Sequence, residues 1–175
     1  METLRRDVVD STNDEAFRLS AEKDPPFIVV ASRQFAGRGQ GDRSWYSEDP
    51  GNLYWTILWR PRQIAQDFRN CSTKVAILLS QALRERYRVP VALKYPNDLM
   101  IQGRKLGGIL TETRVVAEKL QLAVCGVGLN VNGDIERYPE DIRPHCCRLR
   151  DWLPGPLEVR DLEGLLEEIF SRHFL

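Results

Sequence analysis

The sequence predicts an α+β domain in which helices pack on a mixed, mainly antiparallel sheet. Residues 91–130 alternate short apolar runs with turn residues, whereas 68–87 and 158–174 repeat apolar residues at helical spacing. Strands that follow one another through short turns pair as antiparallel hairpins. With 42% hydrophobic residues in a chain of 175, there is enough apolar material for one core.

The N-terminal part predicts a short helix followed by a strand. Ser11, Thr12 and Asn13 precede two acidic residues, an order typical of a helix N-cap and first turn. The Pro25-Pro26 pair ends the helical segment. The β-branched apolar run 27–31 then predicts a buried strand.

A glycine-rich segment, 34–45, follows this strand. It has too much glycine for a helix or strand and too many basic residues for a turn without a functional role, so we expect a mobile loop. Residues 52–59 alternate as a strand does, and Pro61 ends that strand. The apolar repeat over 68–87 predicts the long helix of the core.

The remaining chain predicts consecutive strands and a last helix. The expected strands are 91–95, 99–102, 106–114 and 120–130, with turns at Pro96-Asn97-Asp98 and at Gly103. Residues 158–174 predict the final helix.

The overall composition excludes some classes of partner. Lys plus Arg and Asp plus Glu each number 25, so the formal charge is zero and no basic field is available to hold a nucleic acid. The apolar runs are far shorter than the roughly 20 residues of a membrane span. We therefore expect a cytosolic protein with no nucleic-acid partner and no membrane partner. Its four cysteines lack metal-binding spacing, which favours reduced, structural thiols.

Two clusters carry features of anion binding. In the glycine-rich segment, backbone amides and the guanidinium groups of Arg38 and Arg43 suit a phosphate or carboxylate, although surface loops of this composition without ligands are common. In the second cluster, Lys94 ends one strand and Lys105 begins another, so both ammonium groups could meet at one end of the sheet. The alternative is that both lysines are solvated and that Asn97-Asp98 only forms a turn.

A third cluster is a strand end interrupted by glycine, residues 126–132. Glycine there permits close approach of either a ligand or a packed neighbour, and the sequence does not distinguish these. A Ser-His-Asp or Cys-His arrangement is not expected, because the only histidines, His145 and His173, lie outside all three clusters.

Taken together, these segments resemble the catalytic domain of biotin protein ligases. The matching stretches, in the family's order, are 11–13, 34–39 with Arg43 and Trp45, 51–54, 94–98, 104–110 and 126–130. The most specific part is Lys-aromatic-Pro-Asn-Asp followed by Arg-Lys-Leu-Gly-Gly-Ile-Leu. The resemblance runs from about Asp10 to Asn132 and implies the class II synthetase-like fold of that family.

The resemblance implies three sets of site residues. Biotin would be bound by Ser11, Thr12, Asn13, Gln34, Gly37, Arg38, Gly39, Gln40, Lys105 and Gly108. The nucleotide would be bound by Arg43, Trp45, Lys94, Asn97 and Asn130, with adenine leaning on the indole of Trp45. Lys105, Arg38 and Asp98 would be catalytic, the cations by offsetting charge in the transition state, and Asp98 is the candidate Mg²⁺ ligand.

The implied reaction joins biotin and ATP to biotinyl-5′-AMP and then transfers biotin to a lysine of a biotin carboxyl carrier protein. ATP, biotin and Mg²⁺ are thus the expected small molecules. Two positions depart from the family's pattern: Tyr95 stands where tryptophan is most common, and Gln40 replaces a basic residue of some relatives. We also expect 1–175 to be a single catalytic domain, without an N-terminal DNA-binding domain and without a small C-terminal β domain.

Alternatives remain open. A lipoate or octanoate ligase of the same superfamily is one, although the chain lacks the Gly-Gly-Gly and His-x-Asp patterns of those enzymes. A non-catalytic biotin-binding or sensor protein is another, and the retained Lys94, Asp98 and Lys105 argue against it. Homodimerisation through an edge strand of the sheet is a further hypothesis.

Overall fold

The computed structural model describes residues 1–61, 67–117 and 119–175. A seven-stranded sheet runs through it in the order β1-β2-β3-β7-β6-β5-β4. The strands are β1 (Glu2–Val9), β2 (Phe27–Gln34), β3 (Leu53–Trp59), β4 (Ala92–Lys94), β5 (Asp98–Ile101), β6 (Arg104–Val116) and β7 (Lys119–Leu129). The helices are α1 (Thr12–Leu19), α2 (Cys71–Tyr87) and α3 (Val159–His173). Short 3₁₀ segments lie at Asp67–Asn70, Ile135–Arg137, Arg143–His145 and Leu149–Trp152.

The sheet is mixed and mainly antiparallel, as predicted. Only β1 and β2 run parallel, and the other neighbouring pairs of the described strands are antiparallel. The helices over 71–87 and 159–173 and the strands between 92 and 129 confirm the sequence prediction closely.

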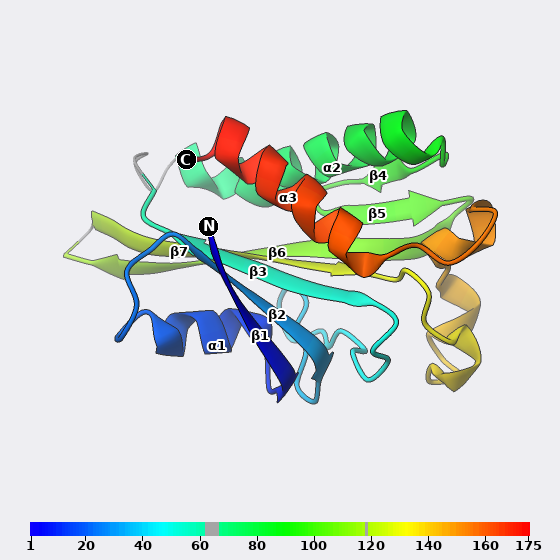
Figure 1. Cartoon of the computed structure of the whole chain (residues 1–175), viewed down its shortest axis with the longest axis horizontal. Coiled ribbons are helices and arrows are strands. Elements are labelled where there is room, and N and C mark those ends of the chain that lie inside the picture. The colour runs from blue at the N-terminus through cyan, green and yellow to red at the C-terminus, as the bar shows by residue number, and fades with distance from the viewer. Residues whose placement is uncertain (62–66, 118) are drawn as a thin grey trace.

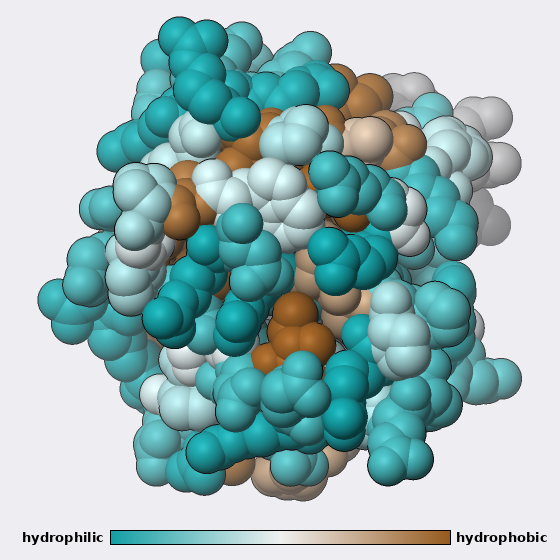
Figure 2. All heavy atoms as spheres, turned by 90° about the vertical axis from the view of Figure 1, so that its right-hand side faces the viewer, coloured by the Kyte–Doolittle hydropathy of each residue, from teal (hydrophilic) through white to brown (hydrophobic). Residues whose placement is uncertain are grey.

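Helices cover both faces of the sheet. In Figure 1, α2 and α3 lie on one side of the strands and α1 lies on the other. The larger apolar core forms beneath α2 and α3, and a smaller one forms beneath α1. The end of the molecule on the right of Figure 1 is mostly hydrophilic, with small hydrophobic areas (Figure 2).

The two-residue repeat of strands decides which core each side chain enters. In β2, Ile28 and Val30 join the core under α2 and α3, whereas Phe27 and Val29 join the core under α1. This is why β2 reads as one continuous apolar run rather than an alternating one.

Strand β7 follows the same repeat but stops filling one face. Leu122 and Val124 pack toward α1, and the next residues on that face are Gly126 and Gly128. Because glycine has no side chain, the sheet leaves space here beyond the end of the small core. The candidate site occupies this space.

Strand β1 was not predicted. Its sequence is charged, and its neighbours decide its position: Arg5 bonds Glu163 of α3 at 2.6 Å, and Arg6 bonds Glu15 of α1 at 2.8 Å. Successive arginines thus point to opposite faces of an edge strand, where charged residues are expected. The apolar-run criterion misses such a strand.

Two expectations from composition bear on the described residues. Within the described ranges, no helix is both long and apolar enough to cross a bilayer. All four cysteines are free thiols, and burial raises the pKa of Cys71 and of Cys147 to about 11. Both thiols therefore stay protonated at neutral pH, which suits a structural role.

We predict that Phe170→Ala strongly destabilises the fold. Phe170 is fully buried, and its ring lies 5.4 Å from that of Trp55 and 4.7 Å from that of Phe174. Removing a buried aromatic ring costs about 3–5 kcal/mol of unfolding free energy, measurable by urea denaturation. The control is Leu175→Ala, which removes a side chain of a residue that is 39% exposed and should change little. Equal stabilities of the two variants would contradict this account of the core.

Candidate active site

The site begins at the turn before α1. Ser11 occupies the N-cap position with extended backbone, as predicted, but its side chain makes no capping hydrogen bond. The hydroxyl is instead available to a cavity that Ser11 lines, although the residue itself is buried. The same turn places Thr12 and Asn13, also buried, over the sheet.

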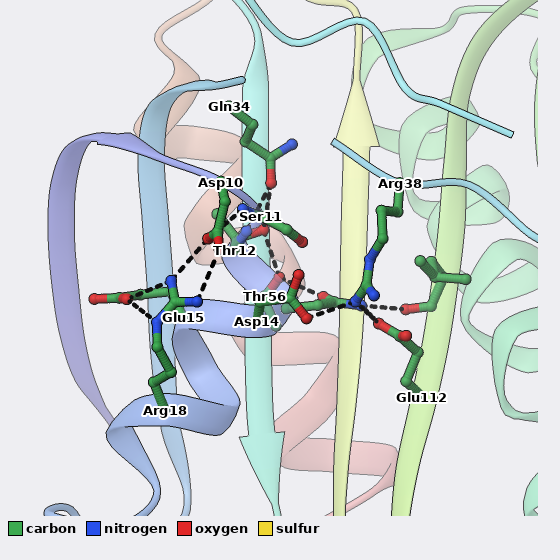
Figure 3. Close-up of polar contacts among 12 residues, drawn as sticks. Asp10, Ser11, Thr12, Asp14, Glu15, Arg18, Gln34, Arg38, Thr56 and Glu112 are labelled. Atoms are coloured by element: carbon green, nitrogen blue, oxygen red, sulfur yellow. Dashed lines mark hydrogen bonds and ion pairs between the residues drawn. The ribbon is translucent and has the colours of Figure 1, made fainter. Parts of the chain in front are cut away.

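Gln34 is held by the turn through its side-chain carbonyl. The backbone N–H and the hydroxyl of Thr12 both donate to Gln34 Oε1, at 2.7 and 3.0 Å (Figure 3). Gln34 Nε2 donates to Ser47 Oγ at 2.9 Å. An amide nitrogen carries two N–H donors, so one remains for a ligand.

A buried hydroxyl on β3 completes this network. Thr56 is fully buried, and its Oγ1 lies 2.8 Å from Thr12 Oγ1 and 2.8 Å from Asn13 Oδ1. Asn13 Nδ2 donates to Glu112 Oε2 at 2.7 Å and to the Leu110 carbonyl at 3.4 Å. The Asn13 side chain lies against Gly126, where any side chain would collide with it.

The glycine-rich segment is more regular than expected. Arg38 and Ser44 form an isolated antiparallel bridge, and Gly39 N–H donates to the Arg43 carbonyl at 2.7 Å. The backbone of Gly37 has no room for a Cβ, which would lie 2.5 Å from Ser47 Oγ and from the Trp45 carbonyl oxygen. The segment is therefore a compact loop whose two sides pair through a short stretch of antiparallel backbone hydrogen bonds. Its mobility remains a prediction.

Arg38 reaches from this segment to the sheet. Its Nη2 lies 2.8 Å from Asp14 Oδ1 and 2.8 Å from Glu112 Oε2 (Figure 3). Asp14 belongs to α1 and Glu112 to β6, so the Arg38 guanidinium links the glycine-rich segment to the helix and to the sheet. All three side chains are partly exposed, so water screens the attraction, and the contacts restrict the position of the guanidinium more than they stabilise the fold.

A register shift aims Lys105 at the site. Asp98 pairs with Gly108 and Leu99 with Gly107, but Met100 pairs with Lys105, which leaves Leu106 as an extra residue. Leu106 is fully buried in the larger core, and Lys105 shares the face of Asp98 and Gly108. Without the bulge, Lys105 would point to the opposite face.

Lys105 is bounded by an acid and an aromatic ring. Its Nζ lies 2.8 Å from Asp98 Oδ1 and 5.2 Å from the ring centre of Trp45. Trp45 in turn packs on Gly128, whose Cβ, if present, would be 2.5 Å from the indole Nε1. The glycine gap in β7 thus accommodates Trp45 as well as Asn13.

These residues surround a cavity of about 100 Å³. The predicted site residues that line it are Ser11, Thr12, Asn13, Gln34, Arg38, Gly39, Gln40, Arg43, Trp45, Asn97, Asp98, Lys105 and Gly108. Gly37, Lys94 and Asn130 do not line it. The sequence clusters therefore meet at one place, on the face of the sheet that carries α1.

The two predicted asparagines of the nucleotide set are engaged within the protein. Asn97 Nδ2 donates to the Ile109 carbonyl at 2.7 Å. Asn130 Nδ2 donates to the Cys147 carbonyl at 3.0 Å and its Oδ1 accepts from the Tyr138 hydroxyl at 2.9 Å. Both side chains thus stabilise the walls, and a contact with nucleotide remains a prediction for each.

A second hollow, of about 180 Å³, adjoins the first. It shares Ser44, Trp45 and Lys105 with the cavity and is also lined by Tyr46, Asn130, Tyr138, Ile142, His145 and Cys146. The ring centres of Tyr46 and Tyr138 are 4.6 Å apart. Lys105 and the Trp45 indole therefore stand between two adjoining spaces.

The sequence interpretation missed several residues of this site. Thr56, Glu112 and Tyr138 carry the internal network but were not predicted. A signal existed for Thr56, the one hydroxyl without an aromatic ring in the apolar strand 53–59. No local signal pointed to Glu112 or Tyr138, because each meets its partners through long-range packing.

The described residues contain no preformed metal cage. Across 1–61, 67–117 and 119–175, no group of three or more His, Cys, Asp or Glu side chains is close enough to hold an ion. Asp98 is the acidic residue that lines the cavity, and Lys105 already bonds its Oδ1.

Comparison with known proteins agrees with this geometry. Residues 5–130 match the biotin/lipoate A/B protein ligase family. The chain belongs to this family. The resemblance and the α+β fold predicted from the sequence are thereby confirmed.

Members of the biotin/lipoate ligase family are similar to most of the chain. The bifunctional ligase/repressor BirA of Bacillus subtilis is 30% identical over 141 residues, which cover 80% of this chain and 43% of BirA. The biotin-[acetyl-CoA-carboxylase] ligase of Paracoccus denitrificans is 35% identical over 126 residues, or 71% of this chain and 52% of that enzyme. The chain thus spans about half the length of these relatives.

A solved relative superposes on nearly the whole chain. The biotin protein ligase of Aquifex aeolicus, in complex with biotin and ATP, has a TM-score of 0.77 and 30% identity, and the match covers 97% of this chain and 69% of that one. The same fold extends to a lipoate protein ligase of Thermoplasma acidophilum, with a TM-score of 0.62 and 14% identity.

We predict that Gly128→Ala displaces the Trp45 indole. The new methyl group would overlap the rigid ring, which must tilt out of its place. Acrylamide should quench the emission of Trp45 more strongly in the Gly128→Ala variant. The emission of Trp45 is obtained by subtracting, with and without Gly128→Ala, the spectrum of the same protein carrying Trp45→Phe. Gly108→Ala is the matched control, because its Cβ meets only ordinary contacts from 3.7 Å. Equal quenching in the two variants would contradict the packing described.

Proposed function

We propose that this chain is a biotin protein ligase that activates biotin with ATP and transfers it to a lysine of a biotin carboxyl carrier protein. One observation carries the proposal: a single cavity joins a buried, neutral hydrogen-bonding end to a cationic end. Biotin has the same polarity, with a neutral ureido head and a carboxylate tail.

The neutral end suits the ureido group. The Ser11 hydroxyl can donate or accept, one N–H of Gln34 Nε2 is uncommitted, and Asn13 Oδ1 has an acceptor site beyond its bond to Thr56. A ureido group needs donors for its oxygen and acceptors for its N–H groups. Buried groups that are already oriented bind such a head with little ordering cost.

The cationic end suits the first half-reaction. A carboxylate oxygen of biotin attacks the α-phosphorus of ATP, the bond to the bridging oxygen breaks, and pyrophosphate leaves. Both reactants are anions, so Lys105, Arg38 and Arg43 offset charge that accumulates in the transition state. Asp98 holds the Lys105 ammonium in place through their 2.8 Å contact.

In the second half-reaction, the amine of the carrier lysine attacks the acyl carbon of biotinyl-5′-AMP. The acyl–oxygen bond breaks, AMP leaves with the electron pair, and the amine nitrogen loses a proton to solvent. A mixed anhydride is open to hydrolysis, so exclusion of water by the glycine-rich segment protects it.

The nucleotide would lie beside Trp45, where the second hollow adjoins the cavity. A broad rigid indole is a good surface for adenine. Lys94 would add positive charge on the side of the phosphates. Asn97 and Asn130 would contact the nucleotide while their side chains keep their hydrogen bonds to backbone carbonyls.

The described residues could hold Mg²⁺ through few protein ligands, with the nucleotide supplying the others. Mg²⁺ bound to nucleotide takes most of its ligands from phosphate and water and one or two from carboxylates. Asp98 can supply one carboxylate, directly or through water, and the described residues offer no larger set. When bound, the ion would neutralise phosphate charge.

We predict that Lys105→Ala slows adenylate formation by about ten- to a hundredfold, because it removes a charge-assisted contact worth about 1.5–3 kcal/mol. The measurement is pyrophosphate release with biotin and MgATP, followed by labelling of a biotin carrier domain. The control is Lys23→Ala, whose ammonium pairs with Glu2 outside the cavity.

The same assay separates the alternatives. Labelling with lipoate in place of biotin would favour the lipoate-ligase alternative. Biotin binding without pyrophosphate release or carrier labelling would favour a sensor. Full activity of the Lys105→Ala variant would contradict the role of Lys105.

We predict that biotin and ATP together slow proteolysis within residues 35–44. If this segment closes over the ligands, its backbone becomes less accessible to a protease. The cleavage rate is followed by mass spectrometry with and without the ligands, and cleavage after exposed basic residues of α3 is the internal control. Unchanged cleavage of 35–44 would count against a closing segment.

A further inference from the structure

We propose that Glu112 is a positioning residue whose single carboxylate sets both the head-group end and the anion end of the site. The inference rests on the proposed function and extends it to a residue outside the cavity walls. Glu112 belongs to β6, and its neighbours there, Leu110 and Gly108, do line the cavity. It therefore acts through other residues.

One oxygen makes both contacts. Glu112 Oε2 accepts from Asn13 Nδ2 at 2.7 Å and from Arg38 Nη2 at 2.8 Å (Figure 3 shows the Arg38 contact). Glu112 can reach both because it lies on the same face of the sheet as Leu110, which pairs with Gly126 beneath Asn13. The glycine gap therefore brings the amide and the carboxylate together.

The first consequence concerns the direction of the Asn13 amide. With Nδ2 committed to Glu112 and the Leu110 carbonyl, Oδ1 must face Thr56 and the cavity. A flipped amide would put its oxygen against the carboxylate, which is repulsive. Glu112 makes the shorter of the two contacts to Nδ2 and the charged one, so it is the main group that turns the Asn13 oxygen toward the cavity, as a ureido N–H requires.

The second consequence concerns Arg38. Its Nη2 is held by Glu112 and Asp14. Among the described residues, Nε and Nη1 of Arg38 have no hydrogen-bond partner, so these donors remain for an anion. Glu112 and Asp14 therefore share the Arg38 contact, but only Glu112 also orients Asn13.

This difference supplies a matched control. Glu112→Ala removes both contacts, whereas Asp14→Ala removes only a contact to Arg38. Two readouts separate the ends of the site: the Kd of biotinol, which has the ureido head but an alcohol in place of the carboxylate, and the rate of cleavage in 35–44 without ligand.

We expect Glu112→Ala to raise the Kd of biotinol about tenfold or more, because a charged hydrogen bond orients Asn13, and to speed loop cleavage. Asp14→Ala should speed loop cleavage but leave the Kd of biotinol unchanged. When Asn13 is already replaced in an Asn13→Ala variant, adding Glu112→Ala should have no further effect on the Kd of biotinol. With Asn13 intact, Glu112→Gln should bind biotinol more tightly than Glu112→Ala, because the Gln oxygen can still accept from Asn13 Nδ2.

Several outcomes would overturn the proposal. Unchanged biotinol affinity in Glu112→Ala refutes the head-group role, and equal losses with and without Asn13 indicate a general structural effect instead. A protein that binds neither biotin nor biotinol refutes the proposed function and the head-group role together. The loop-cleavage comparison still decides whether Glu112 holds Arg38 in that case.

Discussion

Thr56 places a hydroxyl in the middle of a strand that is buried along its whole length. An unpaired buried hydroxyl would cost about 1–3 kcal/mol, so its partners must come from the layer above. Thr12 and Asn13 supply them, which fixes the start of α1 over β3 and leaves the Ser11 hydroxyl at the cavity. Satisfying one buried polar group thus locates the neutral end of the site.

The rest of the site depends on two departures from a regular sheet. Gly126 and Gly128 interrupt the apolar face of β7, and the space they leave holds Asn13 and Trp45. The bulge at Leu106 shifts the alternation of side chains along β6 by one residue. Leu106 therefore enters the core, and Lys105, which precedes it, faces the cavity. A sheet without these irregularities would be a better-filled layer with no place for a ligand.

The arrangement links recognition to chemistry through charge. The neutral end is deep and hydrogen-bonded, and the cations approach from the glycine-rich segment and from β6. Arg38 meets carboxylates of α1 and β6, which hold the loop near the sheet without occupying all of its donors. The proposed reaction would use such a division, because biotin is neutral at its ureido end and would react at its carboxylate end.

Local sequence patterns determined the α+β class, the core helices and the strands between 92 and 129, and the resemblance of short motifs to a known family pointed to cavity residues such as Ser11, Gln34 and Lys105. These features depend on neighbouring side chains and on motifs within a few residues. Tertiary structure alone decided the pairing of β1, the direction of Lys105, the separation of Lys94 from the cavity walls and the role of Glu112. Each of these depends on contacts or on strand register between residues that local periodicity does not relate, because a shift of one residue reverses the face that a side chain occupies.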